Sequence, residues 1–173
     1  MSLSPSLSLS IKQVMLLIFS LLLVANLPAA QLPKDAQFKD WQVKCGRNAN
    51  QGTNCFLLQT VSNKSNDKPI LQAMVGFLPG NKEPSAIFTI ANLLPLNTQL
   101  KLIFSDSFAI SFKIKSCRKQ SFVCIAVLKL DQKLLAQIGI GEVAYLSFTF
   151  AGKDRQVPIS LVGLSSGLDA FKH

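Results

Sequence analysis

Hydrophobic and polar residues alternate along most of the chain after residue 37, which is the pattern of half-buried β-strands. Runs of Asn, Ser, Gly and Pro, such as NKSNDKP and PGNKEPS, separate these segments and predict turns. The segments expected to be strands are FKDWQVKC (38–45), CFLLQTVS (55–62), ILQAMVGFL (70–78), SAIFTIANLL (85–94), TQLKLIF (98–104), FAISFKIK (108–115), FVCIAVLKL (122–130), EVAYLSFTFAG (142–152) and RQVPISLVG (155–163).

Two consecutive segments, 98–104 and 108–115, give the clearest pairing. Each has apolar residues at alternate positions, and the loop Ser105–Ser107 lies between them. A one-residue slip would turn a whole apolar face into water, so the two faces fix the register and require an odd-length loop. The expected pairs are Phe104–Phe108, Leu102–Ile110 and Leu100–Phe112, with Lys101, Lys113 and Lys115 pointing outward.

One segment, LDQKLLAQIGIG, departs from the strand pattern. Asp131 is a typical helix N-cap residue, and Leu134, Leu135 and Ile138 share one helical face before Gly139. The spacing predicts a short helix over 131–138 that Gly139 ends. The closing segment SSGLDAF (165–171) is expected to form a terminal helical turn.

Many short strands with regular turn signals predict an all-β fold, a small β-sandwich. Trp41 alternates with Val43 and Cys45, so we expect it in the core. Pro158 cannot donate to a strand ladder and predicts an edge strand or a bulge.

The first thirty residues predict a secretory signal peptide. A polar start with the single charge Lys12 precedes the uncharged run Val14–Leu27, and small residues follow at Ala29 and Ala30. The alternative is an uncleaved N-terminal anchor, which is the weaker interpretation because the run is shorter than the roughly 20 residues that a membrane span needs. We therefore expect a signal peptide over 1–30, one domain over 31–173, a periplasmic or secreted product, and no stable transmembrane segment after cleavage.

An even number of cysteines in an exported chain indicates disulfide bonds. Cys45, Cys55, Cys117 and Cys124 allow three connectivities, and proximity favours Cys45–Cys55 and Cys117–Cys124. Each short loop is expected to stabilise the fold by about 2–3 kcal/mol. Neither spacing resembles the C-x-x-C of redox enzymes or the paired ligands of zinc sites, which makes those two alternatives weaker.

Charge adds one local candidate for function. The chain has 18 basic and 9 acidic residues, and Lys12 is the only charge in 1–30, so residues 31–173 carry a net charge of +8. A cluster over 113–119 could bind phosphate-rich lipid, lipopolysaccharide or acidic glycans. The competing explanation is a solvated hairpin edge that lysines protect from aggregation. The members of the cluster are Lys113, Lys115, Arg118 and Lys119.

No catalytic arrangement is evident in the sequence. The only histidine, His173, is the last residue, where nothing holds it as a general base. Carboxylates sit mostly beside turns, where caps and turn hydrogen bonds account for them. We therefore expect no enzymatic activity, no catalytic or metal-binding residue and no cofactor. Nucleic acid is not an expected partner, because no aromatic residues interleave with the basic cluster as a stacking surface requires.

Several of these segments together resemble the bacterial invasion-associated locus B family. The resemblance rests on FKDWQVKC, NCFLLQTV, VLKLDQKLLAQIGIGEVAYLSF and VPISLVGLSSGLDAF, and it spans about Phe38 to Phe171. The opening D-W-x-V-x-C and the closing P-I-S-L-x-G-x-x-x-G-x-D-A are its most specific parts.

The resemblance implies a small β-rich protein of Gram-negative envelopes with two local disulfides, and a contribution to host-cell invasion in pathogenic members. It transfers no catalytic residue. The sequence thus favours an exported, non-enzymatic envelope or host-interaction protein, whose partner is a protein or an acidic envelope or host-surface component. The alternative is a periplasmic, chaperone-like accessory factor that adds a strand to client proteins.

Overall fold

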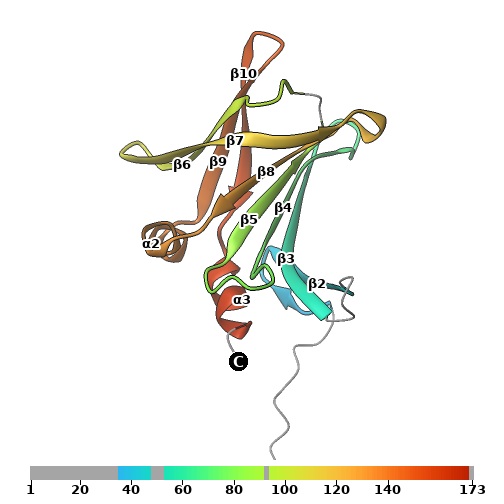
Figure 1. Ribbon diagram of the computed structural model, residues 1–173. Helices are drawn as coiled ribbons and strands as arrows, with labels where there is room; N and C mark the ends of the chain where they lie inside the picture. Colours follow the sequence, from blue (N-terminus) through green and yellow to red (C-terminus); the bar gives the residue numbers. More distant parts are fainter. Residues whose placement is uncertain (1–34, 48–52, 92–93, 172–173) are drawn as a thin grey trace, which may run out of the picture. The chain divides into compact units, whose positions relative to one another are not determined.

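The computed structural model describes residues 35–47, 53–91 and 94–171 (Figure 1). The chain divides into two units, residues 1–31 and 32–173, and every described residue belongs to the second. The expected signal peptide and its boundary with the domain therefore lie outside the described residues.

The described residues form ten strands and three short helical segments. Most strands match the expected segments within a few residues, and the helices follow β7, β8 and β10. The elements are β1 (Gln37–Phe38), β2 (Trp41–Arg47), β3 (Thr53–Ser62), β4 (Pro69–Gly76), β5 (Ser85–Ile90), β6 (Gln99–Ser105), β7 (Phe108–Arg118), the 3-10 helix η1 (Lys119–Ser121), β8 (Val123–Lys129), α2 (Gln132–Ile140), β9 (Val143–Phe150), β10 (Lys153–Ser160) and α3 (Leu164–Ala170).

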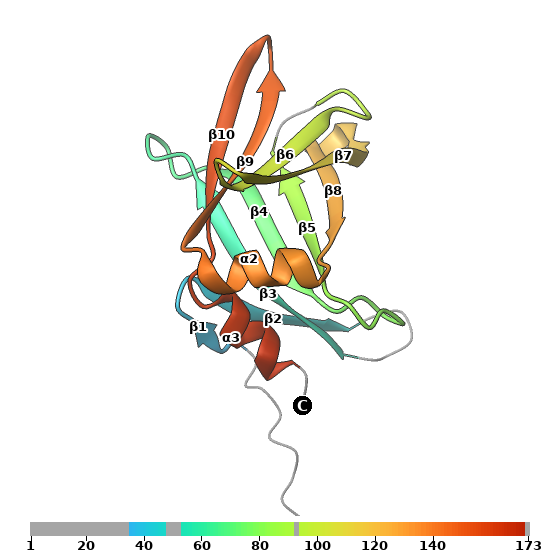
Figure 2. The same ribbon diagram turned by 90° about the vertical axis from the view of Figure 1, so that its left-hand side faces the viewer.

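All ten strands join one antiparallel sheet in the order β1-β2-β3-β4-β5-β8-β7-β6-β9-β10. The sheet turns over at β7, which pairs with β8 through residues 114–118 and with β6 through residues 108–113. Two limbs result: β1–β5 with β8, and β6 with β9 and β10 (Figure 2). The predicted all-β, sandwich-like fold is confirmed.

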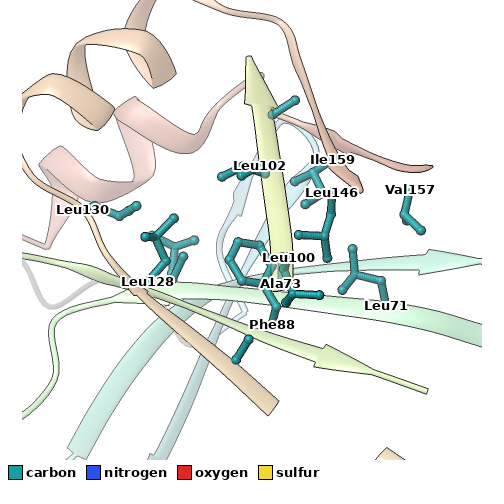
Figure 3. Close-up of a cluster of buried hydrophobic side chains, with 14 of the residues drawn as sticks. Leu71, Ala73, Phe88, Leu100, Leu102, Leu128, Leu130, Leu146, Val157 and Ile159 are labelled. Atoms are coloured by element: carbon teal, nitrogen blue, oxygen red, sulfur yellow. The ribbon is translucent and has the colours of Figure 1, made fainter. Parts of the chain in front are cut away.

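The hydrophobic core lies between the two limbs. Alternate residues of each strand point inward, as the sequence pattern required, and α2 adds Leu134 and Ile138 from one end. Figure 3 shows side chains from both limbs converging: Leu71, Ala73, Phe88 and Leu128 from β4, β5 and β8, and Leu100, Leu102, Leu146, Val157 and Ile159 from β6, β9 and β10.

The limbs are joined at Ser160, the last residue of β10. The Gln59 side chain accepts a hydrogen bond from Ser160 N at 2.9 Å and donates one to Ser160 O at 3.3 Å. The Trp41 indole Nε1 also donates to Ser160 O, at 3.0 Å, and Ser160 Oγ donates to Asp40 Oδ2 at 2.6 Å. We call these four hydrogen bonds the Ser160 latch. β10 and β3 are not paired strands, and side-chain hydrogen bonds link them here.

The strand expected over 38–45 is interrupted. Lys39 and Asp40 form a turn, and Phe38 pairs with Trp41 across it, so β1 and β2 are separate strands. Lys39 takes a left-handed conformation with φ 54°, which the alternation pattern does not reveal. The expected core position of Trp41 is confirmed, because only 1% of its surface is exposed.

The register predicted for β6 and β7 is correct for two of its three pairs. Leu100 faces Phe112 and Leu102 faces Ile110, but Ser105, not Phe104, faces Phe108. A bulge at Phe104 absorbs one residue, and the loop becomes a two-residue turn. The bulge keeps the Phe104 ring on the apolar side, where it packs edge-on against the Phe108 ring with 5.7 Å between the ring centroids.

The predicted helix over 131–138 exists and runs slightly further. Asp131 caps α2 by accepting a hydrogen bond from Leu134 N at 2.9 Å. Gly139 does not end the helix, because Gly141 is its C-cap. The predicted terminal turn is α3, and the edge position that Pro158 indicated is confirmed, because β10 is the outermost strand of its limb.

Both disulfides join residues that face each other across neighbouring strands. Cys45 pairs with Cys55 between β2 and β3, and Cys117 pairs with Cys124 between β7 and β8. This is the connectivity that proximity favoured. Cys124 is fully buried beneath its bridge, whereas the other three are partly exposed.

We predict that Gln59→Met weakens the fold by about 1–3 kcal/mol, because the thioether fills similar space but leaves Ser160 N without a partner. Gln72→Met is the matched control: Gln72 is a half-buried glutamine of β4 with no side-chain hydrogen bond to described residues. It should change the free energy of unfolding by less than about 0.5 kcal/mol. Urea unfolding followed by Trp41 fluorescence measures both, and equal losses would contradict a special role for the latch.

A second prediction concerns Gly163, which has φ 90° and precedes α3. A Cβ there would lie 2.1 Å from the Phe38 carbonyl oxygen, so Gly163→Ala should cost at least about 3 kcal/mol. Gly152→Ala has a similar φ of 73° but open space around it, and should cost only about 1–2 kcal/mol. The difference between their urea midpoints isolates the steric contact; no difference would refute it.

Removing either disulfide should lower the free energy of unfolding by about 2–3 kcal/mol, the value that the loop-entropy model gives for short loops. The Cys117→Ala/Cys124→Ala pair should lose more than Cys45→Ala/Cys55→Ala, because Cys124 alone is fully buried and its truncation also leaves a cavity. Unfolding of the two variants in urea, without reductant, compares them. A larger loss in the Cys45/Cys55 variant would show that burial does not set the order.

Candidate functional site

The basic cluster predicted from the sequence lies on β7 and the turn that follows it. Lys113 and Lys115 are on β7, Arg118 ends it and Lys119 begins η1. All four side chains are exposed, and none takes part in the ion pairs between described residues, Lys44–Asp35 and Lys129–Glu83. We call this cluster, together with Phe122, the basic tip.

The position of β7 bears on the competing explanation for these lysines. β7 lies between β8 and β6 in the sheet order, but residues 108–113 pair with β6 and residues 114–118 pair with β8. Within the described residues each half of β7 therefore has a strand partner on one side only, so protection of a sheet edge by lysines stays an alternative explanation. Lys113 and Ser111 lie in the part that pairs with β6, and Lys115 occupies a bulge opposite β8. Ile114 points inward and is buried, and Lys113 before it is exposed. Because of the bulge, the two residues after it, Lys115 and Ser116, are both exposed.

The turn after β7 is held closed by a disulfide at its base. Cys117 and Cys124 face each other, and the chain between them passes through Arg118, η1 and Phe122. Phe122 has φ 52° and ψ 39°, in the left-handed region, and its N–H donates to Lys119 O at 3.4 Å. The bridge therefore restrains a loop that presents two cationic side chains and a phenyl ring.

Phe122 is the site residue that sequence reasoning missed. Its ring is 65% exposed, although the strand pattern assigned it to the segment 122–130 and phenylalanine was read mainly as core. Alternation back from Ala126 and Cys124 would place Phe122 inward. The strand instead begins at Val123, because the left-handed turn at Phe122 rotates the ring into solvent. No local sequence signal marks that turn.

The basic tip and the Lys129–Glu83 ion pair lie at opposite ends of the sheet. Strand register places the start of β8 and the turn between β3 and β4 at one end, because Cys124 faces Ile90 and Ile90 faces Leu71. The other end of β8 is Lys129, whose pKa is raised by a hydrogen bond from its ammonium to Glu83 and by the charge of that carboxylate. The basic tip thus points away from the end where α2 and Glu83 lie.

The basic tip combines the two features that a group needs to bind an anionic, partly apolar surface. Its cations attract phosphate or carboxylate groups over a distance set by salt, and an exposed aromatic ring can enter an interfacial layer. Within the described ranges, no three His, Cys, Asp or Glu side chains come together as metal ligands, and neither α2 nor α3 is long and apolar enough to span a bilayer.

Comparison with known proteins identifies the family. A search of curated proteins gives no match. Among solved structures, the chain is similar to the crystal structure of invasion associated protein B from Bartonella henselae, with 18% identity over 78% of this chain and 91% of that one and a TM-score of 0.66. At that identity the likeness shows a shared fold. The family model for the invasion associated locus B (IalB) protein matches residues 41–172, so the chain belongs to the invasion associated locus B family.

Proposed function

We propose that this chain is an exported, non-enzymatic protein of the periplasm or cell exterior that attaches through the basic tip to an acidic envelope or host-surface component. The observation that carries the proposal is the exposure of Arg118, Lys119 and Phe122 on one disulfide-closed turn, next to Lys113 and Lys115 on β7, with none of the four cations in an ion pair among the described residues. Family membership, the expected signal peptide and the two disulfides support an extracytoplasmic location. A contribution to host-cell invasion follows if the acidic component lies on a host cell.

The expected strength of this attachment is modest. Each Lys or Arg near an anionic lipid surface contributes about 1 kcal/mol, and burial of a phenyl ring adds about 2 kcal/mol. The total of about 6 kcal/mol corresponds to a dissociation constant of tens of micromolar. Tighter attachment would need several copies or a further contact, and the electrostatic share should fall as salt rises.

A non-enzymatic role is supported by what the reactive groups do in the fold. All four cysteines bridge neighbouring strands, an arrangement that explains them as covalent links between hairpins. This differs from a catalytic C-x-x-C that opens a helix and keeps one sulfur as a thiolate. Among the acidic residues, Asp131 acts as a helix cap and Asp40 accepts a hydrogen bond in the Ser160 latch.

The alternative, a chaperone-like accessory factor, also has a structural observation in its favour. An apolar row crosses the outer face of β7, β6, β9 and β10 and consists of Ala109, Ile103, Tyr145 and Pro158, which face one another in sequence. Tyr145 is 44% exposed and Val143 lies beside it at 39%. Against strand addition, the open part of β10 carries Lys153, Asp154 and Arg155, charges that commonly block edge pairing.

The test is capture from envelope and host-membrane extracts by purified domain at low and high salt. We expect the variant Lys113→Ser/Lys115→Ser/Arg118→Ser/Lys119→Ser to lose the low-salt capture, because it removes the charges that supply most of the attraction. Phe122→Ser should weaken capture at both salts, since its contribution is apolar. Vesicles that contain anionic lipid provide the same comparison with a defined surface.

The matched control replaces four exposed lysines elsewhere with serine: Lys39, Lys82, Lys133 and Lys153. It has the same net charge as the tip variant, so it should retain capture if the position of the charges matters. Equal loss in both variants would reduce the tip to a contribution to net charge. Undiminished capture by the tip variant would overturn the proposal and favour the accessory-factor alternative, which Tyr145→Lys would then test.

A further inference from the structure

Beyond the Ser160 latch, the two limbs separate and leave an open slot. Its walls are β9 and β10 on one side and the end of the β3–β4 hairpin on the other, and its volume is about 390 Å³. The deeper walls are Phe148 and Val157, which are buried; Ile70 and Phe150 are half-buried nearer the mouth. The slot is therefore a recess with an apolar floor and a mixed polar and apolar lining, and it opens to solvent.

A single cation lies among the residues that line this slot. Val157 and Ile159 face the core, so strand alternation places Arg155 on the same inward side of β10, opposite Phe148. Asn63 and Gln156 complete the lining, which contains no carboxylate among the described residues. The adjacent Asp154 lies on the other face, where it accepts a hydrogen bond from Thr149 Oγ1 at 2.8 Å. The slot thus combines four apolar side chains and two amide side chains with one guanidinium near its opening.

Two further cavities lined by described residues lack this combination. The interior cavity beneath Trp41 and Phe88 is wholly apolar and measures about 20 Å³, room for about one water. The groove beside α2 and α3 measures about 270 Å³, but Lys82 is accompanied there by Glu83 and Asp169. Opposite charges at one groove do not select an anion. The slot at β10 is the cavity with a consistent chemical preference.

We propose that this slot binds a single-chain fatty carboxylate, with the acyl chain against Phe148, Phe150 and Val157 and the carboxylate on Arg155. A guanidinium offers a planar pair of donors that fits a carboxylate with two hydrogen bonds. The volume is at the lower end of the range of small-molecule pockets, which suits one chain better than two. The site is separate from the basic tip and does not depend on the function proposed for it.

The test is isothermal titration of the purified domain with sodium decanoate, below its micelle concentration and at a pH where the carboxylate is ionised. Affinity should rise about three- to fourfold for each methylene added from hexanoate to decanoate, as expected for burial of an alkyl chain. Arg155→Gln should weaken decanoate binding about tenfold or more. Decanol, which lacks the anion, should bind wild type and Arg155→Gln equally.

Lys133→Gln, an exposed lysine of α2, is the control of equal charge and should bind decanoate as wild type does. Phe150→Ser shortens the apolar wall and should reduce the chain-length dependence; its thermal unfolding shows whether the domain remains folded. Absence of chain-length dependence, or equal weakening by Arg155→Gln and Lys133→Gln, would overturn the proposal. The four-serine tip variant should bind decanoate normally, so failure here leaves the tip proposal intact, and the reverse also holds.

Discussion

The fold depends on the hydrogen bonds at Ser160, which hold the two limbs of the folded-over, ten-stranded sheet together. A sheet that folds over must bring distant strands together, and here β10 meets β3 through Gln59 and Ser160, which are 101 positions apart in sequence. The Gln59 amide has an acceptor oxygen and a donor NH2 group, so it can satisfy both backbone groups of Ser160. Trp41 adds a further donor while filling the core beneath, which links hydrogen bonding to packing.

The latch joins the limbs at the Ser160 end of β10, and the slot lies toward the other end of that strand. Past the latch, no side chain as well placed as Gln59 joins the limbs in the described residues, and the strands diverge around Phe148 and Phe150. The family to which the chain belongs shares this fold at low sequence identity, as the Bartonella henselae structure shows. The two features that we propose as functional, the basic tip and the slot, contain none of the residues that form the Ser160 latch.

The two disulfides have different consequences for function despite similar local geometry. Cys45–Cys55 reinforces the hairpin that supplies both Trp41 and Gln59 to the Ser160 latch. Cys117–Cys124 closes the turn that carries Arg118, Lys119 and Phe122. A restrained turn loses less conformational entropy on binding than a free one, which favours attachment through a small number of contacts.

The sequence by itself determined the strands, α2 with its Asp131 cap, the burial of Trp41, and two of three pairs in the β6–β7 hairpin, because side-chain period and capping are local properties. Only the tertiary structure decided the Phe104 bulge, the exposure of Phe122, the division of β7 between two partner strands and the pairing of Gln59 with Ser160. Each of these depends on which strands meet, and residues far apart in sequence set that through packing of the whole core.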